Sequence, residues 1–463
     1  MGNDSNNQSF SRKFEVFFNR YTPNSMIFAY ILTVIVAVLA LIFTKVGFVG
    51  LIDAWVKGFW NLLTFAMQMS LIMITGSVVA TSPPVKRLLH RIALAPNSMI
   101  AYFTTLMLIG WVLTWIHWGV GMMVSINLGR EMLTAAKDKG IKVHAPSFIS
   151  TSYCLGIAAV GISQAAPLLG ATKGYLQSLC VNPEAAAYVG PIIPMSKSVL
   201  SPLVLIECVV LFLVIYAVGY IVQPKKANLI VEVNPALYQE MKTQQAVAEQ
   251  KGKVKATTPA ERINTSPVLP WIIGACGLFW CVKLLATEGF IGISINNFNF
   301  ILLMLSVVLC GDTETFIKGC INAVSSIWGV IIQFPFYAGI FGMIAYTGFS
   351  EVIVNAFMSI ATQRTFPLVT YIYSSILNMA VPSGGSKFAI EAPYLLDVCA
   401  RLKVDVGKIL CVYTFGDQTT NIIQPFWALP YLGLYKIEFK EMLPYTFPIC
   451  IASLIVCAIF TFA

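Results

Sequence analysis

The sequence predicts an all-α integral membrane protein with two inverted-topology repeats, comprising about nine spanning helices plus two broken or re-entrant helical hairpins. Three observations support this fold class. Charged residues are scarce, apolar stretches long enough to span a bilayer recur along the chain, and two glycine-containing breaks lie at corresponding places in its two halves. A chain of this kind needs lipid rather than water around most of its surface.

The composition is that of a membrane protein. Of the 463 residues, 57% are hydrophobic and 11% are charged, whereas soluble domains carry roughly 25% charged residues. A spanning helix needs about 20 mostly apolar residues, and residues 26–44, 201–222 and 443–462 are stretches of this kind. Apolar residues surround these stretches on all sides, as in helices enclosed by lipid or protein. We therefore expect a multi-pass protein in the lipid bilayer.

The basic residues divide the chain into three parts. The formal net charge is +9, but Lys and Arg lie between apolar stretches, a positive-inside pattern that argues against a nucleic-acid partner. The polar, lysine-rich residues 223–267 predict a cytoplasmic linker between an N-terminal membrane half, 1–222, and a C-terminal membrane half, 268–463. The polar and then basic start of the chain predicts a retained first helix whose N-terminus is cytoplasmic.

Cysteine and histidine do not indicate a metal centre or a disulfide framework. The eleven Cys include no C-x-x-C pair, and the three His lack metal-ligand spacing. The sequence has no G-x-x-x-x-G-K-[ST] loop, so we expect no ATP-hydrolysing site that drives transport in this chain. We expect no cofactor and no metal site.

Two long apolar stretches are interrupted by helix breakers, at residues 117–121 and 381–386. The first break lies between two basic loops. A re-entrant hairpin that enters and leaves on one side places both loops in the cytoplasm, and two helices that cross the whole membrane are the alternative. Backbone broken at membrane depth is tolerated only where protein or a water-filled cavity surrounds it. Both breaks are therefore candidate sites.

An internal repeat relates the two breaks. The same interval of 265 residues separates Gln68 from Gln333 and Gly119 from Gly384. An extra crossing before Gln333 inverts the direction of the helix that carries Gln333 relative to the helix that carries Gln68. The second hairpin is therefore expected to open to the opposite side of the membrane. Inverted repeats with paired broken helices are typical of secondary transporters, whose sites lie near the bilayer midplane. Gln68 and Gln333 are candidate cavity-lining residues.

The helix start after the second break suits a carboxylate. Pro and Gly cannot continue a regular helix, and a helix start offers free backbone N–H groups and partial positive charge. A tight loop without a ligand is the alternative here. At the first break, Trp118 is either a wall for an acyl chain or an aromatic residue of the membrane interface. The candidate binding residues of the two breaks are Trp118, Gly119, Ser383, Gly384, Gly385 and Ser386.

A polar run follows each hairpin, at residues 161–167 and 416–421. Amides and hydroxyls are costly in lipid unless they face a site or another helix. Asn421 is a candidate substrate contact. An intramembrane carboxylate is a functional candidate by default, so Asp417 is a candidate proton carrier or cation ligand, unless it lies solvated near a helix end.

Three further charged residues lie in apolar surroundings. Glu391 and Lys387 are four residues apart on one predicted helix, so they either neutralise each other or Glu391 takes part in ion coupling. Glu207 is either a buried structural partner or a proton site.

The chain resembles the bacterial short-chain fatty acid transporter family of the acetoacetate and butyrate type. The motifs that carry the resemblance are residues 58–69, 333–339, 380–385 and 424–430. They occur in one order over nearly the whole chain, which is more specific than any one motif. Two positions depart from the family pattern: Ser386 stands where a third Gly is expected, and Asp417 where Glu is expected. These departures put the details of substrate selection and coupling in doubt.

The resemblance implies uptake of fatty acids of about four carbons across the bacterial cytoplasmic (inner) membrane, by a fold with paired hairpins that often forms homodimers. We expect a symporter of a small carboxylate, coupled to H⁺ or Na⁺ through Asp417 and, less directly, Glu391. Trp118, Phe334 and Tyr337 are expected to enclose the alkyl tail. The alternatives are a transporter of another small carboxylate such as a dicarboxylate, a passive channel, and a membrane-embedded enzyme.

Overall fold

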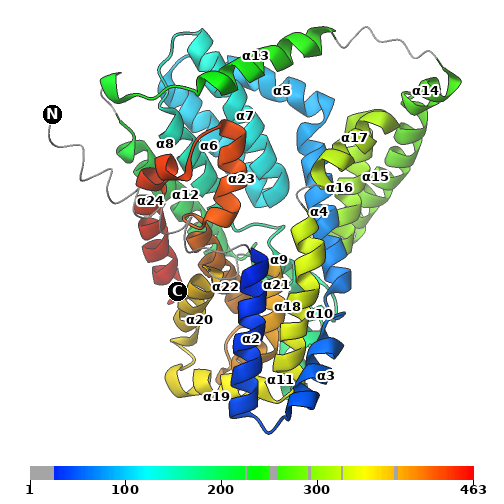
Figure 1. The fold of residues 1–463 in the computed structure, drawn as a ribbon, viewed down its shortest axis with the longest axis vertical. Helices are drawn as coiled ribbons and strands as arrows, with labels where there is room; N and C mark the ends of the chain where they lie inside the picture. Colours follow the sequence, from blue (N-terminus) through cyan, green and yellow to red (C-terminus); the bar gives the residue numbers. More distant parts are fainter. Residues whose placement is uncertain (1–24, 225–226, 251–257, 290–293, 325–326, 380–383) are drawn as a thin grey trace.

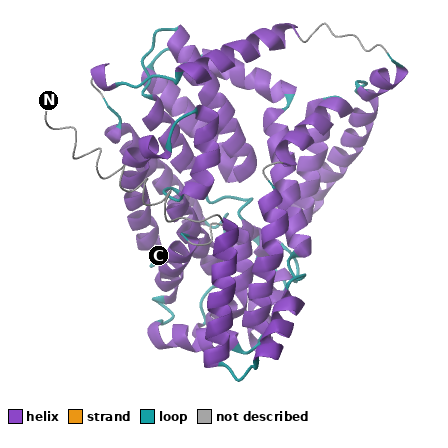
Figure 2. Ribbon diagram, viewed as in Figure 1, coloured by secondary structure: helices purple, strands orange, loops and turns teal. Residues whose placement is uncertain are grey.

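Helices joined by loops make up the part of the chain that the structure describes (Figures 1 and 2). The structure is a computed structural model, and it describes all residues except 1–24, 225–226, 251–257, 290–293, 325–326 and 380–383. The α-helices are α2 (Ser25–Phe43), α3 (Phe48–Gly58), α4 (Leu63–Thr81), α5 (Pro83–Leu94), α6 (Met99–Ile116), α7 (Trp118–Asp138), α8 (Ala145–Ala158), α9 (Ala165–Ala171), α10 (Tyr175–Leu179), α11 (Pro183–Val189), α12 (Pro202–Val222), α13 (Pro235–Gln250), α14 (Pro259–Asn264), α15 (Val268–Glu288), α16 (Ile295–Cys310), α17 (Thr313–Val324), α18 (Trp328–Tyr346), α19 (Phe349–Ile360), α20 (Phe366–Asn378), α21 (Gly384–Leu402), α22 (Val406–Asn421), α23 (Pro425–Tyr435) and α24 (Phe439–Phe460). The all-α prediction is confirmed.

Several of these helices can cross a bilayer. Within the described residues, five stretches are long and apolar enough by themselves: Phe48–Thr81, Met99–Ile116, Pro202–Val222, Pro259–Glu288 and Phe439–Phe460. The pair Ile331–Tyr346 and Phe349–Ile360, bent by 77°, is a sixth candidate. The prediction of a multi-pass membrane protein is therefore confirmed. The count of about nine spans stays a prediction, because α8, α20 and α22 are shorter than the roughly 20 residues that a span needs.

The two halves repeat one order of elements in opposite directions. Helix α4 runs from α3 to α5, whereas α18 runs from α17 to α19 and points the other way (Figure 1). After each comes a short helix, then two hairpin arms, then a half-helix: α5 to α8 in the first half, α19 to α22 in the second. The hairpins α6–α7 and α20–α21 enter from opposite ends of the molecule (Figure 1). The predicted inverted repeat is confirmed.

The repeats pack against each other through matching helices. Helices α2 and α3 pack on α18, and α16 and α17 pack in the same way on α4. Glycine makes the α3–α18 crossing possible: a Cβ on Gly58 would lie 2.5 Å from the carbonyl oxygen of Ala338, and one on Gly342 would lie 2.3 Å from that of Ala54. Close crossings through small residues are common between membrane helices. This contact fixes the frame around which the hairpins are arranged.

Helix α13, in the segment between the two halves, forms a strap across one end of the molecule and lies against α7 (Figure 1). One carboxylate of α13, Glu240, bonds to Arg130 Nη2 at 2.6 Å and to Lys436 Nζ at 2.7 Å. Arg130 belongs to the first hairpin, whereas Lys436 precedes α24 in the second half. Glu240 therefore joins one arm of a hairpin to the opposite repeat.

Replacing Glu240 by Gln is expected to loosen the strap. The hydrogen bond from Lys436, together with the positive charge of Arg130, holds the pKa of Glu240 below its usual range. Its contribution to stability is thus present above the ordinary carboxyl pKa and is lost as pH falls through the lowered folded-state pKa. The side chain of Glu240 is 35% exposed, and ion pairs near the surface contribute at most about 1 kcal/mol each, so amide exchange in α13 should become roughly three- to tenfold faster.

Hydrogen–deuterium exchange of the detergent-solubilised protein measures this change. Glu232→Gln is the matched control, because Glu232 is an exposed linker carboxylate with no ion pair among the described residues. Equal exchange in α13 for Glu240→Gln, Glu232→Gln and the unmodified protein would show that the strap is held by other contacts.

Candidate functional site

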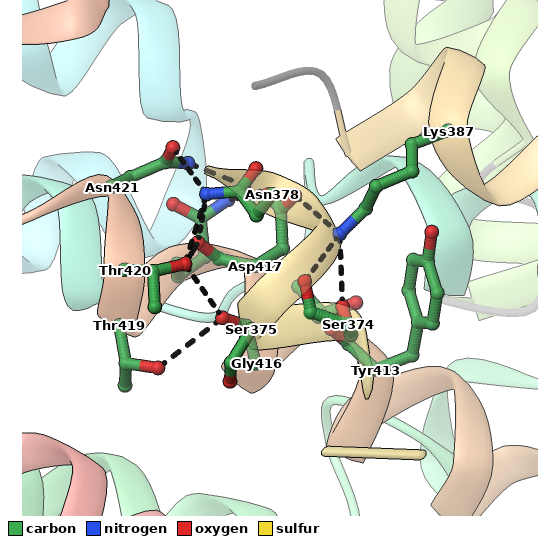
Figure 3. Close-up of polar contacts among 12 residues, drawn as sticks. Ser374, Ser375, Asn378, Lys387, Tyr413, Gly416, Asp417, Thr419, Thr420 and Asn421 are labelled. Atoms are coloured by element: carbon green, nitrogen blue, oxygen red, sulfur yellow. Dashed lines mark hydrogen bonds and ion pairs between the residues drawn. The ribbon is translucent and has the colours of Figure 1, made fainter. Parts of the chain in front are cut away.

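The second hairpin meets α22 in a buried polar cluster. Helices α20 and α22 pack closely, since a Cβ on Gly416 of α22 would lie 2.6 Å from the carbonyl oxygen of Tyr371 in α20. The final turns of α22 carry Asp417, Thr420 and Asn421, which face α20 (Figure 3). Helix α21 begins beside them at Gly384. The sequence thus brings a helix start and a helix end to one point.

A buried ion pair lies at the centre of this cluster. Lys387 Nζ is 3.1 Å from Asp417 Oδ1, and each side chain is 1% exposed. Lys387 also donates to the carbonyl oxygen and the hydroxyl of Ser374, at 2.9 and 3.0 Å (Figure 3), and its Nζ lies 4.7 Å from the centre of the Tyr413 ring. Burial of two charges is costly unless they are paired and hydrogen-bonded, and here the ammonium has both kinds of partner. The alternative of a solvated Asp417 near a helix end does not describe this geometry.

Asn378, the last residue of α20, ties the hairpin to α22. Its Nδ2 donates to the backbone oxygen of Asp417 at 2.9 Å and to Asn421 Oδ1 at 2.7 Å (Figure 3). Asn421 Nδ2 lies 3.4 Å from Asp417 Oδ2. A change in the charge or ligation of Asp417 would therefore be felt directly by the arm of the hairpin.

Glu391 lies one turn beyond Lys387 on α21 and is 1% exposed. It is within electrostatic range of Lys387 and Asp417, and the hydroxyls of Tyr373 and Tyr413 lie near its carboxylate. The ion pair of Lys387 is thus made with Asp417 on the neighbouring helix rather than with Glu391.

The tip of the first hairpin is crossed by the break between α8 and α9. His117 ends α6 and caps α7, with Nδ1 accepting from the backbone N–H of Val120 at 3.1 Å. The N–H of Trp118 donates to Ser163 Oγ at 2.8 Å, and the N–H of Ile162 donates to the carbonyl oxygen of Trp115 at 2.9 Å. These bonds satisfy backbone groups that a broken helix leaves free.

A cavity of about 100 Å³ lies between the two hairpin tips. Its wall is formed by both hairpins, by α4 and α18, and by the two helices that are interrupted in the membrane, α8–α9 and α22–α23. The lining residues are Met69, Met73, Thr114, Trp118, Met122, Gly156, Ile157, Gln164, Ala165, Phe334, Gly384, Gly385, Asp417, Gln418, Asn421 and Trp427. The wall is therefore largely apolar, with a polar patch formed by α22, Gln164 and the start of α21.

The structure brings several of the predicted site residues to this cavity. Trp118, Gly384, Gly385, Asp417 and Asn421 line it, as does Phe334 of the predicted tail-binding wall. Trp118 also packs edge-on against Trp427, with ring centres 5.8 Å apart. Candidates from both breaks and from the polar run at residues 416–421 thus meet at one place.

Other predicted residues lie elsewhere. Gly119 packs against His117, and Gln333 and Tyr337 are buried outside the cavity lining. Gln68 points to α16, where its Nε2 donates to Asn296 Oδ1 at 2.6 Å. Ser383 and the side chain of Ser386 lie outside the described residues.

Sequence reasoning missed several members of the site. Gln164 and Gln418 bond to each other at 3.1 Å across the cavity wall, and both lie in the polar runs that the sequence singled out. Ser374 and Asn378 carried a detectable signal, since two polar residues at i and i+4 in an apolar hairpin arm share one face. Met69 and Met73 of α4 also line the cavity, but no sequence pattern distinguished them from the other apolar residues of that helix.

Comparisons with known proteins agree with this architecture. A curated protein of Escherichia coli (strain K12), provisionally named as a short-chain fatty acid transporter, is 32% identical over 447 residues, covering 96% of each chain. A protein of Haemophilus influenzae (strain ATCC 51907 / DSM 11121 / KW20 / Rd) with the same provisional name is 31% identical over 450 residues, again covering 96% of each.

The fold is also similar to a solved one. The crystal structure of the Alcanivorax borkumensis YdaH transporter, described as having an unusual topology, matches with a TM-score of 0.60 over 95% of this chain and 98% of that one, at 14% identity. The family model described as short chain fatty acid transporter matches residues 8–463. With two curated relatives above 30% identity and a match over nearly its whole length, the chain belongs to the short-chain fatty acid transporter family.

Proposed function

We propose that the protein is a secondary active symporter that carries a short-chain monocarboxylate, such as butyrate or acetoacetate, together with a cation across the bacterial cytoplasmic membrane. The observation that carries this proposal is the cavity between the two hairpin tips, in which a helix start and a buried carboxylate share one wall with apolar side chains. Family membership supports the substrate class.

The cavity offers separate places for the two ends of the substrate. Gly384 and Gly385 open α21 and have no side chains, so a carboxylate can approach the backbone N–H groups at the positive end of this helix. Met69, Trp118 and Phe334 provide an apolar wall for the tail. A volume of about 100 Å³ is well below the roughly 300–1,000 Å³ of drug-sized pockets, which favours a small acid.

The charges of the site give a reason for coupling. Asp417 lines the cavity in which the substrate would bind, and its single negative charge is balanced by Lys387. A substrate carboxylate adds a second negative charge in a site of low dielectric, where like charges repel strongly. A proton or Na⁺ that binds with the substrate at Asp417, or a proton at Glu391, removes this excess. Substrate and cation would then bind more tightly together than alone.

Transport requires that the cavity open to each side in turn. We propose that the hairpin-bearing part moves as a rigid body against the frame of α2–α4 and α16–α18, as inverted repeats permit. The N-terminus and the strap would face the cytoplasm, following the positive-inside pattern. A homodimer is proposed as the working unit, as the resemblance to the family implies.

The lining argues against a dicarboxylate. A second carboxylate would call for a second cationic group in the cavity, and the described lining residues include no Lys, Arg or His. A passive channel remains the other class of membrane protein to test, and it would show neither saturation nor counterflow.

Asp417→Asn is expected to abolish uptake driven by an ion gradient. Labelled acetoacetate uptake into proteoliposomes, with imposed proton and Na⁺ gradients tested separately, measures this. The unmodified protein should respond to one gradient, with saturation and counterflow, and excess succinate should compete poorly. Asp417→Asn should lose the response to that gradient, because its amide carries no charge for a cation to balance.

Asp405→Asn is the control variant. It makes the same chemical change on the same helix, and Asn caps a helix as well as Asp does; Asp405 Oδ1 accepts from the N–H of Lys408 at 2.7 Å, away from the cavity. Uptake that ignores both gradients in the unmodified folded protein, or that is unchanged in Asp417→Asn, would contradict the coupling proposal.

A further inference from the structure

A second cavity lies apart from the transport cavity, where two membrane spans end. Its volume is about 150 Å³. The lining residues are Met99, Lys142, His144, Tyr220, Gln223, Pro224 and Ile230. Met99 is the first residue of α6, and Tyr220, Gln223 and Pro224 belong to the last turn of α12 or follow it. The cavity therefore lies where two candidate spans meet, at the start of α6 and the end of α12.

Gln223 is a buried amide without a partner. Its side chain is 6% exposed, and its Nε2 has no hydrogen-bond partner among the described residues. Leaving a buried polar group unsatisfied costs about 1–3 kcal/mol, and native structures rarely keep one without a reason. Because Gln223 lines the cavity, an acceptor bound there would satisfy it.

The charges around Gln223 favour an anion. Lys142 is exposed at the cavity wall and has no ion-pair partner among the described residues. The seven lining residues include no Asp or Glu. The N-terminus of α6 adds partial positive charge, and the hydroxyl of its cap residue Ser98 accepts from the N–H of Ala101, the third residue of the helix, at 3.2 Å. The free N–H groups of the first turn remain available to an acceptor.

His144 is a neutral part of the wall. Its Nδ1 accepts from the backbone N–H of Val231 at 3.0 Å, and its Nε2 is 2.7 Å from the hydroxyl of Tyr445. Both ring nitrogens are therefore engaged within the protein, and burial lowers the pKa of His144 to about 4. The charge that selects a ligand thus comes from Lys142 and the helix start.

We propose that this cavity is a phosphate-binding site formed by Lys142, the Gln223 amide and the N-terminus of α6, and that its ligand is the headgroup of an anionic phospholipid. The site joins the ends of two spans whose neighbouring side chains, Ile100 and Ile221, are 50% and 67% exposed, so acyl chains would continue along an apolar surface. Basic pockets between spans recognise anionic headgroups in this way. The proposal is independent of the transport cavity and its substrate.

The test follows the Tm of the purified full-length protein in detergent while one probe is added at a time. The probes are dihexanoyl phosphatidylglycerol, dihexanoyl phosphatidylcholine and inorganic phosphate. Phosphatidylglycerol should raise the Tm more than phosphatidylcholine, whose own cation competes with Lys142. A rise with inorganic phosphate alone would still support the phosphate site and assign it to a soluble ligand.

Two variants decide whether the effect comes from this cavity. Lys142→Gln and Gln223→Met should each weaken the apparent affinity for phosphatidylglycerol by about tenfold or more, since each removes a bond to a charged ligand. Gln223→Met should also leave the ligand-free Tm unchanged or raised, because it removes an unsatisfied amide. Lys86→Gln makes the same charge change in α5, at a residue outside the cavity lining, and should bind like the unmodified protein.

A site elsewhere, or none, gives different results. An equal rise with phosphatidylglycerol in all four proteins, an equal response to both lipids, or no response to any probe would overturn the proposal. A lower ligand-free Tm in Gln223→Met would also count against it, since that result would mean that the amide is satisfied within the protein.

Discussion

Lys387→Met should destabilise the protein by about 3–5 kcal/mol, the cost of leaving one partner of a buried ion pair alone. Lys387 and Asp417 are each 1% exposed, with Nζ and Oδ1 3.1 Å apart. Lys387 is also the group that bonds to the backbone of α20, through the carbonyl oxygen of Ser374. Its loss therefore removes both a charge and a connection between the arms of the second hairpin.

The double variant Lys387→Met/Asp417→Asn separates these two effects. Removing both charges avoids an uncompensated carboxylate, and replacement of a whole buried pair is often close to neutral. The double variant should therefore recover most of the stability lost in Lys387→Met. It should not recover uptake driven by an ion gradient, because Asp417 supplies the negative charge on which the proposed coupling depends.

Thermal unfolding in detergent and uptake into proteoliposomes measure the two effects. Lys86→Gln serves as a control for the loss of one positive charge outside the site. If Lys387→Met unfolds like the unmodified protein, or if the double variant is less stable than Lys387→Met, the ion pair is not the stabilising element that its burial indicates.

The architecture was readable from the sequence because the membrane imposes simple rules. Backbone cannot be broken within lipid unless protein or water surrounds it, so the breaks at residues 117–121 and 381–386 identified both hairpins. The interval of 265 residues then related the two halves, and α4 and α18 begin at Leu63 and Trp328, the same interval apart. The sequence pattern and the structure agree here because both depend on where the backbone of a helix is broken.

The direction in which an individual side chain points was harder to predict from the sequence. Gln68 lies on a helix that is apolar on all sides, so no hydrophobic stripe shows which face meets the cavity. The structure turns Gln68 to Asn296 of α16, whereas Met69 and Met73 line the cavity. A lone polar residue in such a helix indicates a polar contact, but the sequence does not identify the residue on the other side of that contact.

The partner of Lys387 was equally out of reach. Spacing along one helix suggests Glu391, since residues at i and i+4 are neighbours. The actual partner, Asp417, lies 30 residues further along the chain on α22, and the close packing of the hairpin on α22 brings the two together. Distances between helices depend on packing, which no pattern within one helix contains.

Gly161→Ala is expected to cost several kcal/mol and to abolish transport, because the added methyl group meets backbone rather than a movable side chain. A Cβ on Gly161 would lie 1.7 Å from the carbonyl oxygen of Trp115. That oxygen accepts the bond from the N–H of Ile162, which holds the α8–α9 break against the first hairpin. Overpacking costs about 1–3 kcal/mol, and a buried N–H left without its bond costs about 1–3 kcal/mol more.

Gly433→Ala is the matched control. Gly433 is an exposed residue of α23, and a Cβ there would have no atom within 4 Å. Since Ala favours a helix over Gly by about 1 kcal/mol, this variant should be as stable as the unmodified protein or slightly more so.

A normal Tm and normal acetoacetate uptake in Gly161→Ala would mean that the break and the hairpin tip can separate without loss, and that their crossing does not position the cavity. A lower Tm with normal uptake would restrict the crossing to a structural role, whereas the loss of both would tie the geometry of the cavity to this single close approach of two backbones.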